Sequence, residues 1–247
     1  MKRYKIILLT ACIGALLTGV YCLTQYAAPP SGQAETPTKG AAQFAGRHDI
    51  KNSPYFAAPD IYNMHSNKHL LLLENFKTRQ QITGYTCAPA AAAMVVEHFL
   101  HRDLHDEMAI AKIMGTSKIN GTSIKGVVKY FQEIGWEVRS SASDTAPQDY
   151  AAFQRFVRQY LEQNTPIIVE NVDWGGHYRV IIGYDSMDTE YGGDDVLLLA
   201  DPFDLADQIQ DGYNVVNAQK FYYMWFDAQL FPSGERQHPW IAAWPKK

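Results

Sequence analysis

The chain has 247 residues, a formal net charge of −4 at pH 7 and an aromatic content of 13%. The aromatic content argues against an intrinsically disordered chain, and the acidic balance excludes a nucleic-acid-binding protein, which would need a basic face.

The N-terminal region has the pattern of an export signal. Lys2, Arg3 and Lys5 precede an apolar run of 18 residues at positions 6–23. This run is long for a cleaved signal and just long enough to span a bilayer. A retained anchor is therefore favoured over cleavage, and over lipidation at Cys12. We predict that residues 1–28 are a signal peptide or membrane anchor of an exported bacterial protein. The protein would lie in the periplasm or at the outer face of the cytoplasmic membrane, either anchored or secreted.

The next residues, 29–46, are small, polar and rich in proline, which predicts a flexible linker. Residues 47–247 then form one predicted domain of about 200 residues, large enough for a single core. The first 28 residues hold three basic and no acidic side chains, so removing them from a total of −4 leaves a formal charge of −7.

Hydrophobic periodicity predicts the elements of this domain in chain order. A strand is expected within residues 69–77, and helices are expected over 89–100, 106–114, 123–134 and 149–163. Short apolar runs then predict strands over 166–172, 177–184 and 196–200. Trp240 and Trp244 are interpreted as a C-terminal packing segment. Helices followed by an antiparallel sheet indicate the α+β class.

Cys87 is the only cysteine outside the N-terminal apolar segment. A loop precedes it, and Pro89 with the alanines at 90–93 predicts that a helix starts there. The positive end of a helix dipole favours the thiolate form of such a cysteine. A lone cysteine in an exported protein cannot form an internal disulfide, so Cys87 is either an inert buried thiol or a reactive one.

The predicted hairpin brings an imidazole to a carboxylate. Symmetric pairing around residue 189 places His177, at the start of one strand, opposite Asp201, at the end of the next. Gly175 and Gly176 precede His177 and allow another chain to approach closely. Together with Trp174 they are candidate substrate-binding residues.

These residues suit a cysteine peptidase. Cys87 supplies a nucleophile, His177 a general base and acid, and Asp201 a group that orients the ring. Gln81, in the loop before Cys87, is a candidate oxyanion donor. Gln80 is a rival for the oxyanion role, and Asp185 is a less favoured rival for the orienting role. No cofactor and no metal are expected, and the histidines at 98, 101 and 105 are interpreted as a solvated helix face.

Three motifs in this order resemble the bacteriocin-processing, double-glycine-type cysteine peptidases, family thirty-nine of the papain-like superfamily. The motifs are Gln-x5-Cys-x-Pro-Ala from Gln81, Gly-His-Tyr-x-Val-x-x-Gly-Tyr-Asp from Gly176, and Ala-Asp-Pro around Asp201. The resemblance implies a papain-like fold in its stand-alone form, with N-terminal helices packed on an antiparallel sheet. It also implies a peptide or protein substrate and the four roles given above.

Two departures from the family pattern bear on function. Ala88 stands where the family usually has glycine, and the ATP-hydrolysing transporter domain fused to the best-known members is not expected here. The main hypothesis is an exported peptidase that cleaves peptide or related amide bonds. The alternatives are a catalytically idle relative that binds peptides or cell-wall material, and a thiol acyltransferase, since an amine can replace water as the acceptor.

Overall fold

The computed structural model describes residues 40, 59–102, 106–205, 208–228 and 230–246. The predicted signal or anchor at 1–28, and the predicted linker apart from Gly40, lie outside the described residues. Within the described part of the chain, no helix is both long and apolar enough to cross a membrane.

An antiparallel sheet with strands of different lengths forms the centre of the domain. Among the described residues it has seven strands in the order β2-β7-β3-β4-β5-β6, with β1 paired to β4. The strands are β1 (Leu70–Leu72), β2 (Glu137–Ser140), β3 (Ile167–Asn171), β4 (His177–Asp185), β5 (Val196–Ala200), β6 (Tyr213–Asn217) and β7 (Trp240–Trp244). β4 is paired along both edges, with β3 and β1 sharing one edge and β5 lying along the other. It is buried at every position, because α2 and α5 also pack against it.

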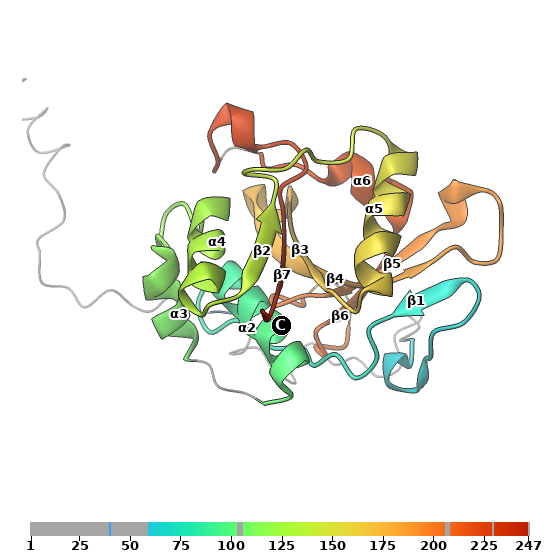
Figure 1. The fold of residues 1–247 in the computed structure, drawn as a ribbon, viewed down its shortest axis with the longest axis horizontal. Helices are drawn as coiled ribbons and strands as arrows, with labels where there is room; N and C mark the ends of the chain where they lie inside the picture. The colour runs from blue at the N-terminus through green and yellow to red at the C-terminus, as the bar shows by residue number, and fades with distance from the viewer. Residues whose placement is uncertain (1–39, 41–58, 103–105, 206–207, 229, 247) are drawn as a thin grey trace, which may run out of the picture. The chain divides into compact units, whose positions relative to one another are not determined.

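Five α-helices are described, and Figure 1 shows α2, α3 and α4 gathered together, apart from α5 and α6. Their bounds are α2 (Cys87–Leu100), α3 (Glu107–Met114), α4 (Ile124–Glu133), α5 (Tyr150–Glu162) and α6 (Ala218–Met224). The side chains of Asp106, Ser123 and Asp149 cap α3, α4 and α5 by accepting hydrogen bonds from backbone N–H groups of the first turn. The four predicted helices are therefore present, with ends shifted by at most two residues.

The first α-helix of the described residues, α2, is enclosed by protein along most of its length. Every residue from Ala88 to Val96 is buried, and the helix packs against β4. Its alanines leave little side chain to fit between the helix and the sheet, which permits close packing on all sides. This burial fixes the end of the helix at Cys87 rigidly with respect to the strand that begins at His177.

Several helices and strands of the structure were not predicted, and one strand was predicted over too long a range. β2, β6 and α6 were missed, and the predicted strand at 69–77 is reduced to Leu70–Leu72. The segment interpreted as C-terminal packing is strand β7, which lies between β2 and β3. β2 and β6 mix polar and apolar residues without a long apolar run, so only their pairing with neighbouring strands makes them strands.

Candidate active site

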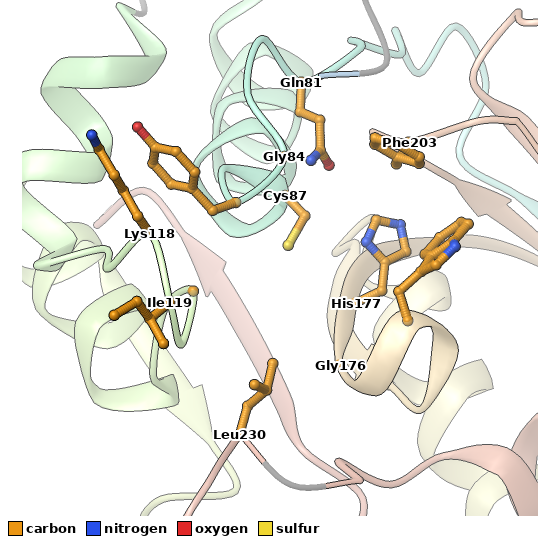
Figure 2. Close-up of a pocket in the computed structure, with 12 residues that line it drawn as sticks. Gln81, Gly84, Cys87, Lys118, Ile119, Gly176, His177, Phe203 and Leu230 are labelled. Atoms are coloured by element: carbon orange, nitrogen blue, oxygen red, sulfur yellow. The ribbon is translucent and has the colours of Figure 1, made fainter. Parts of the chain in front are cut away.

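The thiol of Cys87 faces a cavity at the N-terminal end of α2 (Figure 2). The loop before it is held by its own side chains, since the hydroxyls of Thr83 and Thr86 lie 2.9 Å apart. Thr86 is fully buried at the N-cap position of the helix. Cys87 is only partly buried, and it makes no disulfide. The predicted loop, thiol and helix therefore occur as expected.

The cavity has a volume of about 360 Å³ and separates two walls. In Figure 2, Lys118 and Ile119 lie on one side, and His177 and Phe203 lie on the other, with Cys87 between them. The whole lining consists of Gln81, Gly84, Tyr85, Cys87, Lys118, Ile119, Gly121, Trp174, Gly176, His177, Phe203 and Leu230. Apolar side chains such as Ile119, Phe203 and Leu230 line this cavity together with a few polar groups near the thiol, which is the usual composition of a binding pocket.

His177 and Asp201 form a buried hydrogen-bonded pair. His177 Nε2 lies 2.7 Å from Asp201 Oδ1, and the two side chains are only 4% and 0% exposed. Burial alone would lower the pKa of His177, but the Asp201 carboxylate and an interaction with Cys87 outweigh it and raise this pKa to about 9. With Nε2 occupied by Asp201, Nδ1 is the nitrogen left for Cys87. The site therefore favours an imidazolium beside the thiol.

The contact between His177 and Asp201 does not arise from the register that the sequence predicted. Val180 pairs with Ala200 and a bulge follows between Ile181 and Gly183, so the hairpin is not symmetric around residue 189. His177 instead pairs with Asn171 on β3. Continuing the ladder from Val180 places Asp201 beside Arg179, and the carboxylate reaches His177 diagonally. Diagonal neighbours on one face of a sheet are close enough for long side chains to meet.

The Asp201 carboxylate has hydrogen-bond donors on both oxygens. Oδ1 also accepts from the backbone N–H of Phe203 at 2.8 Å, and Oδ2 accepts from Arg179 Nε at 2.6 Å. Burial would raise the pKa of Asp201, but His177 and Arg179 hold it well below its usual range. Asp201 is therefore a fixed anion behind the imidazole. Arg179 was missed by the sequence analysis; its signal was a charged residue within an apolar strand.

The structure separates Gln81 from its rival Gln80. Gln81 is 2% exposed and lines the cavity, with Nε2 donating to the Thr83 carbonyl at 2.7 Å. One of its two amide N–H bonds is thus used locally, and the other is available to the cavity. Gln80 is engaged elsewhere, since Nε2 donates to the backbone oxygen of Asp201 and Oε1 accepts from Asp204 N–H. Gln81 is therefore the glutamine positioned beside Cys87.

Gly40 approaches the same loop from the N-terminal side. It is buried, and a Cβ atom at this position would lie 2.3 Å from the Gln81 carbonyl oxygen and 2.5 Å from Thr83 N. Only glycine allows the backbone to pass this closely. The position therefore contributes to holding the loop that carries Gln81.

Two of the three predicted substrate-binding residues line the cavity. Trp174 is 63% exposed and adopts a left-handed conformation with φ of 53°. Its ring lies edge-on to His177, with 5.0 Å between centroids. Gly176 also lines the cavity, whereas Gly175 does not and instead accepts a hydrogen bond from Ala228 N–H. Trp174 and Gly176 thus form part of one wall.

The other candidates lie outside this cavity. Asp185 is at the far end of β4, where it binds His69 Nδ1 at 2.8 Å, so it does not reach His177. His98 is mostly buried and contacts the Asn164 carbonyl, and His105 lies outside the described residues. Among the residues that the structure describes, no three His, Cys, Asp or Glu side chains are grouped to hold a metal ion.

A pair of buried carboxyl groups, missed by the sequence analysis, lies under the wall at Gly176. A Cβ atom on Gly176 would be 2.5 Å from Glu170 Oε1 and 2.8 Å from Asp227 Oδ2. Glu170 is 1% exposed, and neither of its carboxyl oxygens accepts a hydrogen bond from the described residues. Burial, followed by the neighbouring Asp227 carboxylate, raises the pKa of Glu170 to about 10. Glu170 therefore holds a proton at neutral pH. Its sequence signal was an acidic residue inside a buried apolar strand.

We expect Glu170→Gln to be more stable than the wild-type protein at high pH. The pKa of Glu170 is about 10 in the folded state against an ordinary 4.5, so only the folded state keeps the proton between these values. Folding stability then falls as pH rises through this window, and glutamine, which cannot lose the proton, removes that loss. Thermal unfolding at pH 5, 7 and 9 measures the effect. Glu162→Gln, on the exposed side of α5, is the matched control. A Glu170→Gln protein less stable than wild type at pH 9 would contradict the assignment.

The fold and the cavity define a class of protein. A cysteine at a helix start, facing an imidazole and carboxylate on an antiparallel sheet, is the arrangement of a papain-like α+β cysteine peptidase. Residues 73–228 match the model of the Peptidase_C39 like family, so the chain belongs to this family and is a cysteine peptidase.

Solved structures of peptidase domains resemble the chain more distantly. The peptidase domain of Streptococcus ComA, described as a bi-functional ABC transporter involved in a quorum sensing pathway, is 20% identical with a TM-score of 0.46. The match covers 70% of this chain and 100% of that domain. The peptidase domain of Streptococcus mutans ComA is 17% identical with a TM-score of 0.41, covering 69% and 100%. Comparison with curated proteins gave no match.

Proposed function

We propose that this protein is an exported cysteine peptidase that cleaves peptide or related amide bonds through Cys87, His177 and Asp201, with Gln81 as an oxyanion donor. The observation that carries the proposal is one cavity lined by Cys87, His177 and Gln81, in which the His177 ring is held by a buried carboxylate. Membership of a cysteine peptidase family supports the same reaction.

The geometry suggests how the reaction proceeds. The Cys87 thiolate attacks the substrate carbonyl carbon, and the negative charge that forms on oxygen is stabilised by the Gln81 amide and the Cys87 backbone N–H. The His177 imidazolium donates its Nδ1 proton to the departing amine, leaving a thioester on Cys87. Neutral His177 then takes a proton from water as the water oxygen attacks the thioester carbon. The C–S bond breaks, which releases the acid product and restores the Cys87 thiolate beside a protonated His177. Asp201 keeps Nε2 occupied throughout, so Nδ1 stays directed toward the sulfur.

An experiment with a thiol-directed activity probe tests the proposal. The full-length protein is treated with a peptidyl acyloxymethyl ketone, and labelled peptides are identified by mass spectrometry. Fluorogenic peptide amides of varied sequence are assayed in parallel. We expect labelling at Cys87 and hydrolysis of some of the amides, with both lost in His177→Ala. Labelling without hydrolysis of any amide would support an idle relative, and transfer of the acyl group to an added amine in preference to water would support an acyltransferase.

Gln81→Ala should lower kcat by roughly 10²–10³ with little change in KM. The amide acts on charge that exists only in the transition state, so its loss does not weaken substrate binding. Steady-state kinetics on a cleaved peptide amide measures both constants. Gln80→Ala is the matched control, because this neighbour supports the backbone around Asp201 and Asp204 instead of facing the cavity. Gln80→Ala should lower the melting temperature, and it should lower kcat much less than Gln81→Ala does. A large fall in kcat in Gln80→Ala, with little change in Gln81→Ala, would assign the oxyanion role to Gln80.

The N-terminal segment should keep the protein at a membrane. The apolar run at 6–23 follows three basic residues and is long enough to span a bilayer. Fractionation of cells that express the full chain with a C-terminal tag measures its location, and protease accessibility measures its side. We expect a full-length membrane-bound protein with its domain outside the cytoplasm. A soluble domain that lacks its first 28 residues would identify a cleaved signal instead.

A further inference from the structure

Arg179 is a buried charge in the strand that carries His177. It lies two residues after His177 on β4 and is 4% exposed. A guanidinium is costly to bury unless its N–H groups are paired with anions or other acceptors. Arg179 has such partners: Nε donates to Asp201 Oδ2 at 2.6 Å, and Nη1 lies 2.5 Å from Asp173 Oδ2 and 3.3 Å from Asn171 Oδ1. The side chain is therefore fixed between two carboxylates.

These two carboxylates belong to different parts of the site. Asp201 holds the His177 ring, whereas Asp173 opens the short helical turn η3 (Asp173–Gly175). This turn carries Trp174 in its left-handed conformation and leads to Gly176, and both residues line the cavity. A guanidinium has donors in a rigid planar fork, so fixing one carboxylate also fixes the direction of the other. Arg179 thus connects the carboxylate behind the imidazole with the part of the cavity wall formed by Trp174 and Gly176, next to His177.

We propose that Arg179 is a positioning residue for the peptidase reaction, because it joins the Asp201 carboxylate behind His177 to Asp173 and, through Asp173, orders the cavity wall at Trp174. The proposal rests on the proposed function of the cavity. Two effects are expected from it. The link to Asp173 orders the wall and acts on substrate binding, and the positive charge beside Asp201 acts on the protonation of His177.

The charge effect has a definite sign. Within the described part of the chain, the charged or titratable groups that act on His177 are Asp201, Cys87 and Arg179, and the neighbouring Trp174 and Phe203 rings are neutral. Arg179 opposes protonation of His177, so removing its charge should raise the pKa of His177. Asp201 would keep its contacts to His177 Nε2 and the Phe203 N–H on Oδ1, and so would remain behind the ring.

Four variants of the full-length chain separate the two effects. Arg179→Met removes both the charge and the fork, Arg179→Lys keeps the charge without the fork, and Asp173→Asn weakens only the link to the wall. Arg155→Met, on an exposed position of α5, controls for loss of an arginine. The titration of His177 is followed by NMR on protein with labelled histidine rings, assigned with His177→Ala. KM and kcat are measured on a peptide amide that the wild type cleaves.

The expected results differ between the variants. Arg179→Met should shift the His177 titration to higher pH and raise KM, whereas Arg179→Lys and Asp173→Asn should raise KM about 3- to 10-fold and leave the titration near the wild-type value. Arg155→Met should change neither. The proposal is overturned if folded Arg179→Met titrates like wild type, or if KM is unchanged in both Arg179→Lys and Asp173→Asn.

Two results would separate this proposal from the proposed function. If no peptide amide is cleaved, the peptidase assignment fails, while the His177 titration still decides whether Arg179 acts on the imidazole. If Arg179→Met does not fold, the KM values of Arg179→Lys and Asp173→Asn decide the proposal.

Discussion

Cys87→Ala and His177→Ala should each lower kcat for peptide cleavage by roughly 10⁴- to 10⁶-fold, and the double variant should lose no more than the larger of the two. The nucleophile and its acid–base partner act as one unit, so once either is absent the other contributes nothing further. The activity that remains would come from substrate binding and the oxyanion donors alone.

A second histidine–aspartate pair provides the control for this experiment. His69 binds Asp185 with a 2.8 Å contact at the opposite end of β4, away from the cavity. His69→Ala should leave kcat within about twofold of wild type, because the residue meets no reacting group. Additive losses in the double variant, or a large loss in His69→Ala, would contradict the assigned roles. Steady-state kinetics, normalised to the concentration of folded protein, measures all four proteins on the same scale.

Asp201→Asn should move the loss of activity at alkaline pH to a much lower pH. The reaction needs the imidazolium as the acid that protonates the leaving amine, and the pKa of His177 is raised to about 9 by the Asp201 carboxylate and Cys87 against the effect of burial. Wild-type activity should therefore persist up to about pH 9 and fall above it. A neutral asparagine removes the main opposing charge, while Arg179 and burial continue to favour the neutral ring. The pKa of His177 should then drop to its ordinary value of about 6.5 or below.

The pH profile of kcat/KM measures this shift. At pH 6 the Asp201→Asn protein should keep more activity than Asp201→Ala, since an amide can still orient the ring through its oxygen. At pH 8 the Asp201→Asn protein should have lost most of that activity, while the wild type has not. An alkaline limb near pH 9 in Asp201→Asn would show that the carboxylate charge does not control the imidazole, and that Asp201 only packs behind it.

Local chemistry determined the part of the site around Cys87. Pro89 and the alanine run specify a helix through the residues themselves, and Asp106, Ser123 and Asp149 mark the starts of later helices because their side chains bind the first N–H groups. These interactions span only a few residues. The position of the thiol at a helix start, and the α+β order of elements, could therefore be predicted without tertiary contacts.

The tertiary structure decided how the remaining groups meet. The sequence alone favoured Gln81 but left Gln80 as a rival, and the contacts of Gln80 with Asp201 and Asp204 are what direct Gln80 away from the cavity. The β4–β5 hairpin pairs Val180 with Ala200 and has a bulge between Ile181 and Gly183, so its register differs from the one predicted, and β7 enters the sheet from the far end of the chain.

Dependence on tertiary contacts also explains why the sequence did not identify the buried charged residues. Arg179 meets Asp173 and Asp201 across strands and a turn, and Glu170 meets Asp227 from a segment more than fifty residues later in the chain. Hydrophobic pattern and local capping are encoded within one element. Strand register and the pairing of buried charges depend instead on groups brought together only when the sheet closes, because each side chain's energy there is set by its distant partner.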